Sequence, residues 1–528
     1  MTDRNDKPTE VLIVGAGPAG LMMACQLAIH RIPFRIIDKN ESSSKNSGAL
    51  IVQARSLEIF EQMGIASEAL TQGIVAGKLN IIYNGKKITS TVINDIGGNL
   101  SRFPFLLMLE QSKTEKLLLK FIIDHGHIIE RGIRFKSFSQ ENEKTTSVVV
   151  LPDGSEQSII SNYVIAADGA NSSIRNFLNI PFEGKTYLKP IFILDVKAKT
   201  ELLPGEISFT FSNSSVAGFF PLPGSRWRID SDIPPELEKL DRITFVDIEK
   251  DFHRWTKMKI TFQDYDWFSV AHSHQKYAKT IHVRNCFLIG DAAHINTPVG
   301  AQGMNTGLQD AFNLAWKLAF VIRHKAKPEL LNTYSTERSG ISRDFARYAD
   351  TVFKLVTSTH VVVKFFRLYL LRFVFKFLFP LVENRKSVKQ KFFKSISQTG
   401  IHYRKSILSD RTQVGNFLSG SPKPGDRFPY LEFYYMGKNT NTLEILDVTG
   451  FTLFVLANEL TEEIKVLAGN YNLAVKLISH QSGTEKLYEQ LGIKHIGYYL
   501  VRPDMHIALR SASLNTRHLN NYLQKFLS

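Results

Sequence analysis

Residues 15–20 of this chain read Gly-Ala-Gly-Pro-Ala-Gly and stand between a short apolar run and a stretch with helical periodicity. A GxGxxG phosphate-binding motif requires this strand–turn–helix context. Gly15 allows the tight turn, Gly17 lets a pyrophosphate approach the backbone, and Gly20 lets the helix pack closely on the strand. Free N–H groups at the helix start then favour the phosphate charge. We therefore expect a dinucleotide site, whose residues are Gly15, Gly17, Pro18, Ala19 and Gly20.

Three aspartates stand at the ends of apolar runs that are typical of buried strands. Asp38 lies about 20 residues beyond the glycine motif, where an acid is expected to accept ribose hydroxyls. Asp168 and Asp291 end two later runs. A carboxylate suits such positions because it accepts hydrogen bonds from a polyol through both of its oxygens. Asp168 has an alternative role as a cap of the helix that follows it, and the two roles are compatible.

Three segments, in this order, resemble the FAD-dependent aromatic hydroxylases, also called class A flavoprotein monooxygenases. They are the glycine motif, Asp168-Gly169, and the stretch from Gly290 to about residue 307. The resemblance implies that one FAD is held by these segments at its ADP end, its ribityl chain and its ring. It also implies that the helix start near 303 directs N–H groups at the ring, which is negatively charged when reduced. The residues implied in the third segment are Gly290, Asp291, Pro298, Gly300, Gly303, Met304 and Asn305.

Two further segments resemble the same family. The segment around Arg55 is similar to one that passes beside the flavin, where a basic side chain helps to hold the cofactor. The segment around Gln111 is similar to one whose glutamine bonds the flavin chain. The chain has Leu50-Ile51 where phenol hydroxylases carry an Asp-Gly pair. This departure argues against simple phenol as the substrate.

The resemblance implies a reaction in which NAD(P)H reduces FAD, O2 adds to the flavin, and the resulting hydroperoxide hydroxylates an aromatic substrate, phenolic or polycyclic. The expected partners are FAD, NAD(P)H as co-substrate, O2 and a small aromatic molecule. No general base is assigned, because the candidates are chosen only by their place in the chain; they are Tyr187, Arg228, His272 and His274.

Two alternatives stay open at this point. One is another flavoenzyme of the same fold, such as a halogenase or a prenyl-lipid reductase. The other is a flavin-free, membrane-associated scaffold that retains the fold. The halogenase motif Trp-x-Trp-x-Ile-Pro is absent from the sequence, which argues against a halogenase.

The resemblance predicts an α/β protein with a Rossmann-type FAD-binding domain, an interleaved β-sheet substrate domain and a carboxy-terminal thioredoxin-like domain without a Cys-x-x-Cys pair. Apolar runs predict strands of the substrate sheet at 191–198, 206–211, 216–222 and 227–230. A turn-rich segment at 419–426 is typical of a linker before the last domain. The expected division is 1–180 with 276–350 for the FAD-binding domain, 181–275 for the substrate sheet, 351–418 for a helical connecting region and 419–528 for the thioredoxin-like domain.

Composition favours a soluble globular protein rather than a secreted or nucleic-acid-binding protein. The 528 residues are long enough for two or three domains. Cys25 and Cys286 lie in apolar runs, and the chain starts without a secretory signal, so we expect a reducing, cytoplasmic location and no metal site. The net charge of +15 comes without a nucleic-acid-binding motif, which predicts a basic surface and no nucleic-acid partner.

Two expectations concern other contacts of the chain. Residues 351–382 contain no acid and are both apolar and basic. This pattern is typical of a helix packed on the FAD-binding domain, which we favour, or of one in weak contact with a membrane surface. The last domain is expected to serve packing or a homodimer contact.

Overall fold

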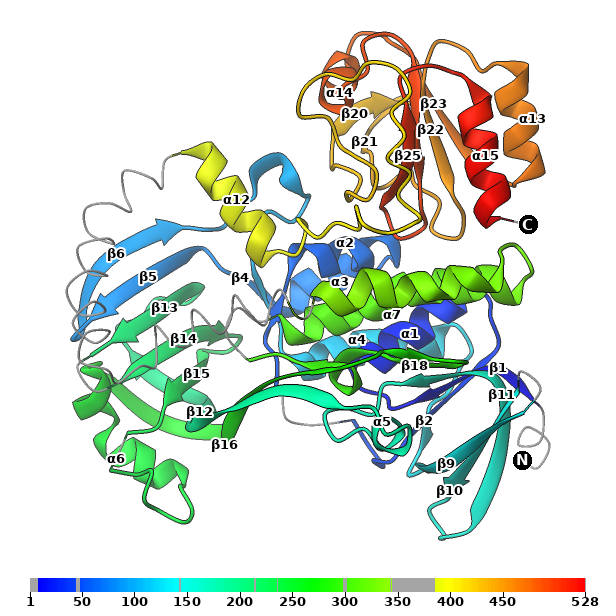
Figure 1. Ribbon diagram of the computed structural model, residues 1–528. Helices are drawn as coiled ribbons and strands as arrows, with labels where there is room; N and C mark the ends of the chain where they lie inside the picture. The colour runs from blue at the N-terminus through cyan, green and yellow to red at the C-terminus, as the bar shows by residue number, and fades with distance from the viewer. Residues whose placement is uncertain are drawn as a thin grey trace.

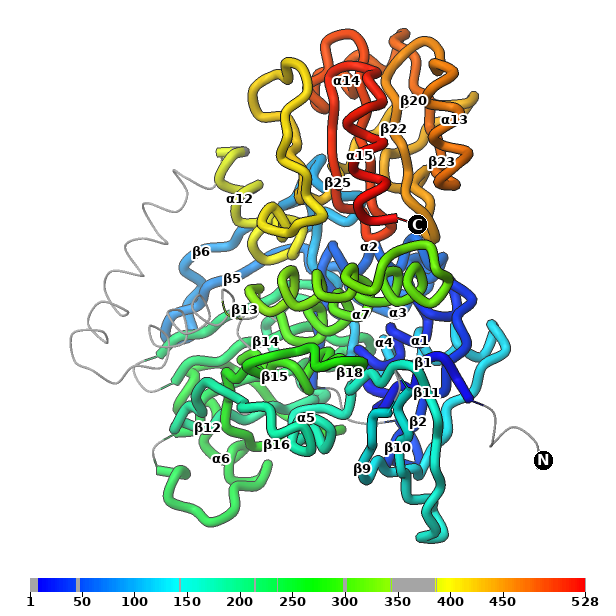
Figure 2. Tube along the Cα trace, turned by 45° about the vertical axis from the view of Figure 1, so that its right-hand side comes forward, coloured from blue at the N-terminus to red at the C-terminus, as the bar shows by residue number. Residues whose placement is uncertain are grey.

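The chain folds into one sheet that carries the glycine motif, a second sheet beside it, and a carboxy-terminal α/β unit (Figure 1, Figure 2). The long helix α7 (Gly303–Ile322) runs between the first sheet and the carboxy-terminal unit (Figure 1). The computed structural model describes residues 8–43, 48–141, 144–212, 215–234, 236–297, 302–341, 343 and 385–527.

The first sheet is built around parallel strands that end in the predicted motifs. Its central strand β1 (Thr9–Val14) lies between β2 (Phe34–Asp38) and β11 (Glu156–Ala166), and β18 (Cys286–Leu288) pairs with the other side of β11. These are the apolar runs that the sequence indicates as strands, and most of their residues are buried. Because the carboxyl ends of parallel strands meet at one edge, the three motifs and Asp38 leave the sheet at the same edge.

Helices cover the first sheet and complete its core. α1 (Pro18–Ile29) follows the glycine motif and packs against α7 and α4 (Gln111–Asp124). Its apolar side chains are buried on every face, as expected of a helix enclosed between a sheet and other helices. The shorter elements of this unit are β3 (Ile51–Val52), β4 (Ile74–Val75), β7 (Leu107–Met108), β8 (Glu130–Arg131), β9 (Arg134–Glu141), β10 (Lys144–Val150), β17 (His282–Val283), α2 (Ala54–Gln62), α3 (Ala66–Gln72), α5 (Ser173–Phe177), η1 (Gly98–Leu100), η2 (Gly290–Ala292) and η3 (Pro328–Leu331).

The second sheet contains the four strands predicted for the substrate domain and several more. Its strands are β5 (Lys78–Tyr83), β6 (Lys86–Val92), β12 (Phe182–Thr200), β13 (Glu206–Phe211), β14 (Val216–Leu222), β15 (Arg226–Asp232), β16 (Ile260–Ala278) and β19 (His294–Ile295). Their order is β19-β16-β12-β15-β14-β13-β5-β6. β5 joins by parallel pairing with β13, so the sheet draws on residues outside the predicted range 181–275. Pairing between strands so distant in the chain has no local sequence signal.

The two faces of the second sheet pack against different parts of the molecule. Phe219 and Trp227 belong to a small core beneath α6 (Phe245–Thr256). Side chains alternate between the faces along each strand, so Phe220 and Leu222 point the other way. There they pack into the large core that the second sheet shares with the first unit. The sheet therefore turns this second face toward the unit with the glycine motif.

The carboxy-terminal unit has a four-stranded sheet of order β23-β22-β24-β25 among the residues that the structure describes. β22 and β23 are parallel, and the other two pairs are antiparallel. The predicted thioredoxin-like fold stays a prediction, which this order and the alternation of strands and helices support. The elements are β20 (Glu432–Tyr435), β21 (Lys438–Asn441), β22 (Thr452–Leu456), α13 (Glu462–Asn470), β23 (Ala474–Ile478), α14 (Glu485–Leu491), β24 (Gly497–Val501), β25 (Ile507–Ser511) and α15 (Thr516–Phe526).

The predicted connecting region is described only in part. α12 (Lys386–Ile396) packs near Gly97 of the first unit through Phe393. Residues 351–382, predicted as a packed or membrane-contacting helix, lie outside the described residues. Within the described ranges, no helix combines the length and apolar character needed to cross a membrane.

Candidate active site

The glycines of the first motif have different structural roles. Gly15 has φ +106°, and a Cβ atom on it would lie 2.3 Å from the Ala167 carbonyl oxygen. A Cβ on Gly20 would lie 1.9 Å from the Gly15 carbonyl oxygen. A Cβ on Gly17 would meet no atom within 4 Å. Gly15 and Gly20 are thus required for close packing, whereas Gly17 leaves open space beside the start of α1, as a phosphate-binding turn requires.

Asp38 is fixed against the glycine turn. Its Oδ2 accepts a hydrogen bond of 2.6 Å from the Ala16 N–H, and its Oδ1 accepts one of 2.8 Å from the Asn40 N–H. The Arg131 guanidinium lies 3.8 Å from Oδ1. The side chain is therefore held at the edge where the ribose contact is predicted. That contact itself stays a prediction.

Asp168 combines a capping role with one uncommitted oxygen. Its Oδ2 accepts hydrogen bonds from the N–H groups of Ser173 (2.7 Å) and Ile174 (3.2 Å), at the start of α5. Its Oδ1 is buried and has no hydrogen-bond partner within the described residues. Burial raises the pKa of this carboxyl, and the helix-start hydrogen bonds oppose the rise. The second oxygen has the chemistry needed to accept a hydroxyl of a ligand.

The turn with Gly290 and Asp291 is held from beneath by Asp310 of α7. Asp310 is fully buried and accepts hydrogen bonds from the Gly290 N–H (3.0 Å), His294 Nε2 (2.7 Å) and Arg338 Nε (2.7 Å). Desolvation opposes ionisation of Asp310, but Arg338 and His294 outweigh it and lower the pKa of this carboxyl. Asp310 was not among the predicted site residues, although an acid within a buried apolar helix is a signal for a buried ion pair.

Asp291 itself is available to a ligand. Its side chain is exposed to solvent, yet desolvation by the surrounding protein raises the pKa of its carboxyl. Solvent exposure and a raised pKa occur together when protein atoms surround a carboxyl group on most sides and solvent reaches it from one side. A carboxylate in this setting can accept hydrogen bonds from the hydroxyls of a bound polyol.

The structure brings the three motifs into contact. A Cβ on Gly290 would lie 2.8 Å from the Ala19 Cβ, which joins the third motif to the first. Arg175, after the second motif, donates hydrogen bonds to the carbonyl oxygens of Ala170 (2.8 Å) and Ala292 (3.0 Å). The Arg175 guanidinium also stacks 3.7 Å from the centre of the Phe182 ring. Segments separated by more than a hundred residues therefore line one edge of the sheet.

The start of α7 is anchored by Asn305. Its amide oxygen accepts hydrogen bonds from the Gln53 N–H (2.9 Å) and Ser56 Oγ (2.8 Å), and its amide nitrogen donates to the Ile51 carbonyl (2.8 Å). Nearby, a Cβ on Gly303 would meet nothing within 4 Å, and Met304 is partly buried against the core. The helix start is thus positioned by backbone groups just before α2 and by one side chain in the first turn of α2. Two predicted ring contacts, Pro298 and Gly300, lie outside the described residues.

Gln111 and Arg55 make protein contacts that the sequence analysis did not predict. Gln111 Oε1 accepts a hydrogen bond from the Ala49 N–H at 3.0 Å, and Gln111 Nε2 donates to Glu115 at 2.9 Å. Arg55 is fully buried, and its guanidinium contacts Glu58 (3.1 Å) and the Asp504 carbonyl oxygen (2.8 Å). The structure therefore joins the Arg55 side chain to the carboxy-terminal unit rather than to the glycine motif.

Of the four residues considered as a general base, only Arg228 is fully buried. His272 and His274 lie on β16, where His272 is exposed and His274 is close to Thr186 Oγ1 at 2.9 Å. Tyr187 is partly exposed and contacts His272 through its carbonyl oxygen. The sequence could not separate these candidates, because side-chain burial depends on the sheet partners.

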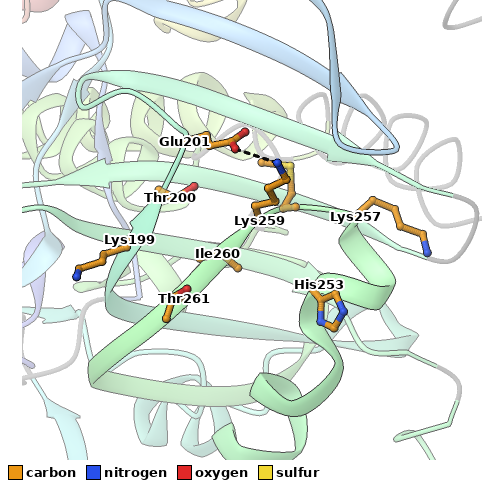
Figure 3. A pocket seen from close by; sticks show the side chains of 9 residues that line it. Lys199, Thr200, Glu201, His253, Lys257, Lys259, Ile260 and Thr261 are labelled. Atoms are coloured by element: carbon orange, nitrogen blue, oxygen red, sulfur yellow. Dashed lines mark hydrogen bonds and ion pairs between the residues drawn. The ribbon is translucent and has the colours of Figure 1, made fainter.

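An open groove of about 660 Å³ lies elsewhere, on the outer end of the second sheet beside α6 (Figure 3). Its lining includes Lys199, Lys257 and Lys259, with Lys259 paired to Glu201 at 3.3 Å. It contains none of the predicted cofactor residues. The groove is a basic surface feature, and the motifs converge at another place in the molecule.

Comparison with known proteins agrees with this geometry. The family described as "FAD binding domain" matches residues 8–349. A 6-methylpretetramide 4-monooxygenase of Streptomyces rimosus is 27% identical over 533 residues, which cover 98% of this chain and 93% of that protein. The uncharacterized aromatic compound monooxygenase YhjG of Bacillus subtilis (strain 168) is 30% identical over 505 residues, 94% of this chain and 93% of that protein. The crystal structure of the flavin-dependent monooxygenase PieE shares the fold, with a TM-score of 0.80, 20% identity, and coverage of 99% of this chain and 100% of that chain.

The chain belongs to the family of FAD-dependent aromatic hydroxylases. It is a flavin-dependent monooxygenase, and its cofactor is FAD. The residues present fit this group, because Gly17 leaves room for a pyrophosphate and the Asp168 and Asp291 carboxylates have oxygens for ribose and ribityl hydroxyls. The curated relatives described above are monooxygenases, and they give no support to the halogenase, reductase or scaffold alternatives.

Proposed function

We propose that this protein uses NAD(P)H and O2 to hydroxylate a polycyclic aromatic substrate that carries a phenolic hydroxyl. The observation that carries the proposal is the convergence of the three motifs at one edge, with an aromatic-lined face of the second sheet turned toward the same unit. A polycyclic substrate is favoured because one relative that covers nearly the whole chain is named for 6-methylpretetramide. Leu50-Ile51, in place of an Asp-Gly pair, argues against simple phenol.

The chain's residues have distinct tasks in this reaction. Bound FAD supplies the transfer of electrons from the nicotinamide to O2 and of one oxygen atom to the substrate. The turn at Gly15 and Gly17 would hold the pyrophosphate at the start of α1. Asp38, Asp168 and Asp291 would accept hydrogen bonds from cofactor hydroxyls. The start of α7 would direct N–H groups toward the ring and stabilise negative charge there.

Two measurements test the proposal. The purified protein should be yellow with a flavin absorption spectrum, and phenolic compounds should be screened for those that accelerate NAD(P)H oxidation. The proposal requires an oxygenated product from at least one polycyclic phenol. Oxidation that yields only hydrogen peroxide with every compound would contradict it. A protein without bound or bindable flavin would contradict the family role itself.

The expected cellular location, oligomeric state and membrane contact stay predictions. We propose a cytoplasmic enzyme with no nucleic-acid partner, in which the carboxy-terminal unit serves packing or a homodimer contact. Size-exclusion chromatography with light scattering would decide the oligomeric state. Flotation with anionic vesicles would test the predicted weak membrane contact of 351–382.

A further inference from the structure

A buried ion pair lies at the centre of the face that the second sheet turns toward the FAD-binding unit. Arg228 of β15 donates two hydrogen bonds to Asp195 of β12, from Nε to Oδ1 at 2.7 Å and from Nη2 to Oδ2 at 2.6 Å. Residues directly opposite in an antiparallel pair point to the same face. Arg228 is opposite both Asp195 and Phe220, and Phe220 packs against the core that the second sheet shares with the FAD-binding unit. The ion pair therefore lies on the inner face.

A second contact places this face beside the predicted cofactor residues. Arg226, two residues before Arg228 and so on the same face, donates from Nη2 to both carboxylate oxygens of Glu110 at 3.2 Å. Glu110 immediately precedes Gln111, whose segment is predicted to lie along the flavin chain. The inner face of β15 and the residue that precedes α4 are thus in direct contact, two residues along β15 from the Arg228–Asp195 ion pair.

Asp230 is the next residue of β15 on the inner face. Its Oδ1 is buried and has no hydrogen-bond partner among the residues that the structure describes. The cation that acts electrostatically on Asp230, the Arg228 guanidinium, is already paired with Asp195 through two hydrogen bonds. Because the guanidinium is committed in this way, Asp230 is left as a partly buried carboxyl whose buried Oδ1 is uncommitted. A buried polar atom of this kind needs an explanation.

The surroundings of Asp230 suit an aromatic ligand. Asp230 is opposite Gly218 on β14, and a Cβ on Gly218 would lie 2.9 Å from Phe220 and 3.1 Å from Phe209. These two rings meet edge to face, with centroids 5.7 Å apart. The absent side chain at 218 thus leaves the carboxyl beside the edges of two aromatic rings. Such a mainly apolar wall with one convergent polar group is typical of small-molecule sites.

We propose that Asp230 binds the phenolic hydroxyl of the substrate and accepts its proton during hydroxylation. The proposal rests on the proposed function. The substrate O–H bond breaks and the proton passes to Asp230 Oδ1, while the electron pair of that bond stays on the substrate oxygen. The resulting phenolate makes the ring more electron-rich and so more reactive toward an electrophilic oxygen atom. Arg228 acts as a positioning residue that places positive charge beside the phenolate.

The electrostatics of the site agree with this role. Burial raises the pKa of Asp230 to about 6; Arg228 opposes the rise and Asp195 adds to it. Arg228 and Asp195 are the charged groups that act on Asp230 from β15 and β12, and Glu110 acts on Arg228 from the FAD-binding unit. Asp230 is ionised above pH about 6, so proton acceptance requires a pH above this value. A base with a pKa close to the working pH is effective in general-base catalysis.

The test compares the flavin-loaded wild type with Asp230→Asn and with a matched control, Asp232→Asn. Asp232 is two residues further on the same strand and face, and its Oδ1 accepts hydrogen bonds from the Val216 N–H (2.8 Å) and Ser215 Oγ (2.9 Å). An asparagine oxygen can accept the same bonds, so the control variant keeps the local structure. Anhydrotetracycline and pentachlorophenol serve as phenolic probes. The readouts are perturbation of the flavin spectrum by each probe and kcat/KM as a function of pH.

We expect kcat/KM of the wild type to rise as pH increases through about 6. Asp230→Asn should lower kcat/KM by about 100-fold and remove this rise. Asp232→Asn should stay within about twofold of the wild type at every pH, as is usual for a substitution that keeps its hydrogen bonds. If Asp230→Asn fails to retain flavin, Asp230→Glu replaces it and must keep a rise with pH.

The outcomes separate the two proposals. If the wild type hydroxylates a probe and Asp230→Asn keeps both the rate and the pH dependence, the inference is overturned while the proposed function stands. The same holds if Asp230→Glu loses the rise with pH. If the wild type holds FAD but neither binds nor hydroxylates either probe, the proposed substrate class fails and the inference fails with it.

Discussion

At the scale of single residues, the glycine motif separates packing from binding. Gly15 and Gly20 are required because a Cβ at either position would lie within 2.3 Å of a carbonyl oxygen. Gly17 has open space where a Cβ would stand, so the fold by itself does not require glycine there. We propose that the open space serves the approach of a phosphate to the backbone. The three glycines thus make different predictions when each is changed to alanine.

Gly17→Ala should lower FAD affinity while leaving the stability of the flavin-free protein nearly unchanged. The added methyl group meets no protein atom, but it occupies the path of the pyrophosphate. We expect a loss in affinity of at least about tenfold, which corresponds to about 1.4 kcal/mol. Fluorescence titration with FAD and thermal unfolding of the flavin-free protein check this. Gly469→Ala in α13, where a Cβ also has open space, is the control and should bind FAD normally.

Asp230→Asn should raise, rather than lower, stability at pH about 8. The pKa of Asp230 is raised to about 6 in the folded protein. The folded protein therefore loses stability as pH rises from about 4 through about 6, because the ionised carboxylate is less favourable in the folded state than in the unfolded chain. Asparagine avoids this cost, and we expect a gain on the order of 1–2 kcal/mol. Urea unfolding of wild type and variant at pH about 5 and about 8 measures it. A variant that is less stable at the higher pH would show that Asp230 has a structural role instead.

At the scale of elements, helix α7 binds two of the loops at the sheet edge where the three motifs converge. Asn305 in its first turn binds the backbone before α2, and Asp310, about one and a half turns later, binds the Gly290 N–H. The helix is buried along nearly its whole length, so its polar residues must be paired within the protein. The partners of Asn305 lie in the segment before α2, and a partner of Asp310 is the turn at Gly290. The helix therefore fixes the relative placement of these loops.

Asp291 and Asp310 are close together in space, but substitution by asparagine should lower the free energy of unfolding only at Asp310. Asp310→Asn leaves the buried Arg338 without its charge partner, and we expect a loss of about 3 kcal/mol or more in the free energy of unfolding. Asp291→Asn removes a carboxylate that is exposed and whose pKa is raised, so stability at neutral pH should not fall. FAD affinity should fall in both variants. Urea unfolding and FAD titration test the pair, and equal destabilisation would contradict the assigned roles.

At the scale of the whole molecule, a buried charge network joins the carboxy-terminal unit to α7. Arg502 donates to Glu337 through Nη1 at 2.6 Å and Nη2 at 2.9 Å, and it also pairs with Asp504. Lys317 of α7 donates to the same Glu337 at 2.7 Å. All of these side chains are fully buried, so removal of one charge leaves another uncompensated. The carboxy-terminal unit is thus held as a structural partner of the helix that supports the cofactor edge.

This network predicts acid-sensitive stability. Burial opposes ionisation, but Arg502 and Lys317 outweigh it and lower the pKa of Glu337 to about 2, and Arg502 and His506 lower that of Asp504. A lowered carboxyl pKa stabilises the fold above the usual pKa, and this contribution is lost as pH falls from about 4.5 toward about 2. Arg502→Met should lower the free energy of unfolding by about 3–5 kcal/mol at neutral pH. It should also make the free energy of unfolding less dependent on pH in the acid range. Urea unfolding across this range checks both, and an unchanged profile would refute the role of the network.

Local sequence patterns determined the parallel strands that end in the motifs, the glycine turn and four of the strands of the substrate sheet. Each is an apolar run bounded by turn residues, and hydrophobic periodicity acts over a few neighbouring residues. The capping role of Asp168 was predictable for the same reason, because its partners Ser173 and Ile174 follow it closely in the chain. The order of the three motifs also identified the family and its cofactor, which the comparisons confirm.

Tertiary structure alone decided which distant groups meet. Nothing near Arg55 indicates Asp504, more than four hundred residues away, and nothing near β13 indicates β5. Asp230 has its raised pKa and its uncommitted oxygen because the fold buries that oxygen and because Arg228 is paired with Asp195 on the neighbouring strand. Burial and ion pairing depend on contacts between segments far apart in the chain, so a single sequence predicts the local elements and motifs but not the environment that gives a side chain its function.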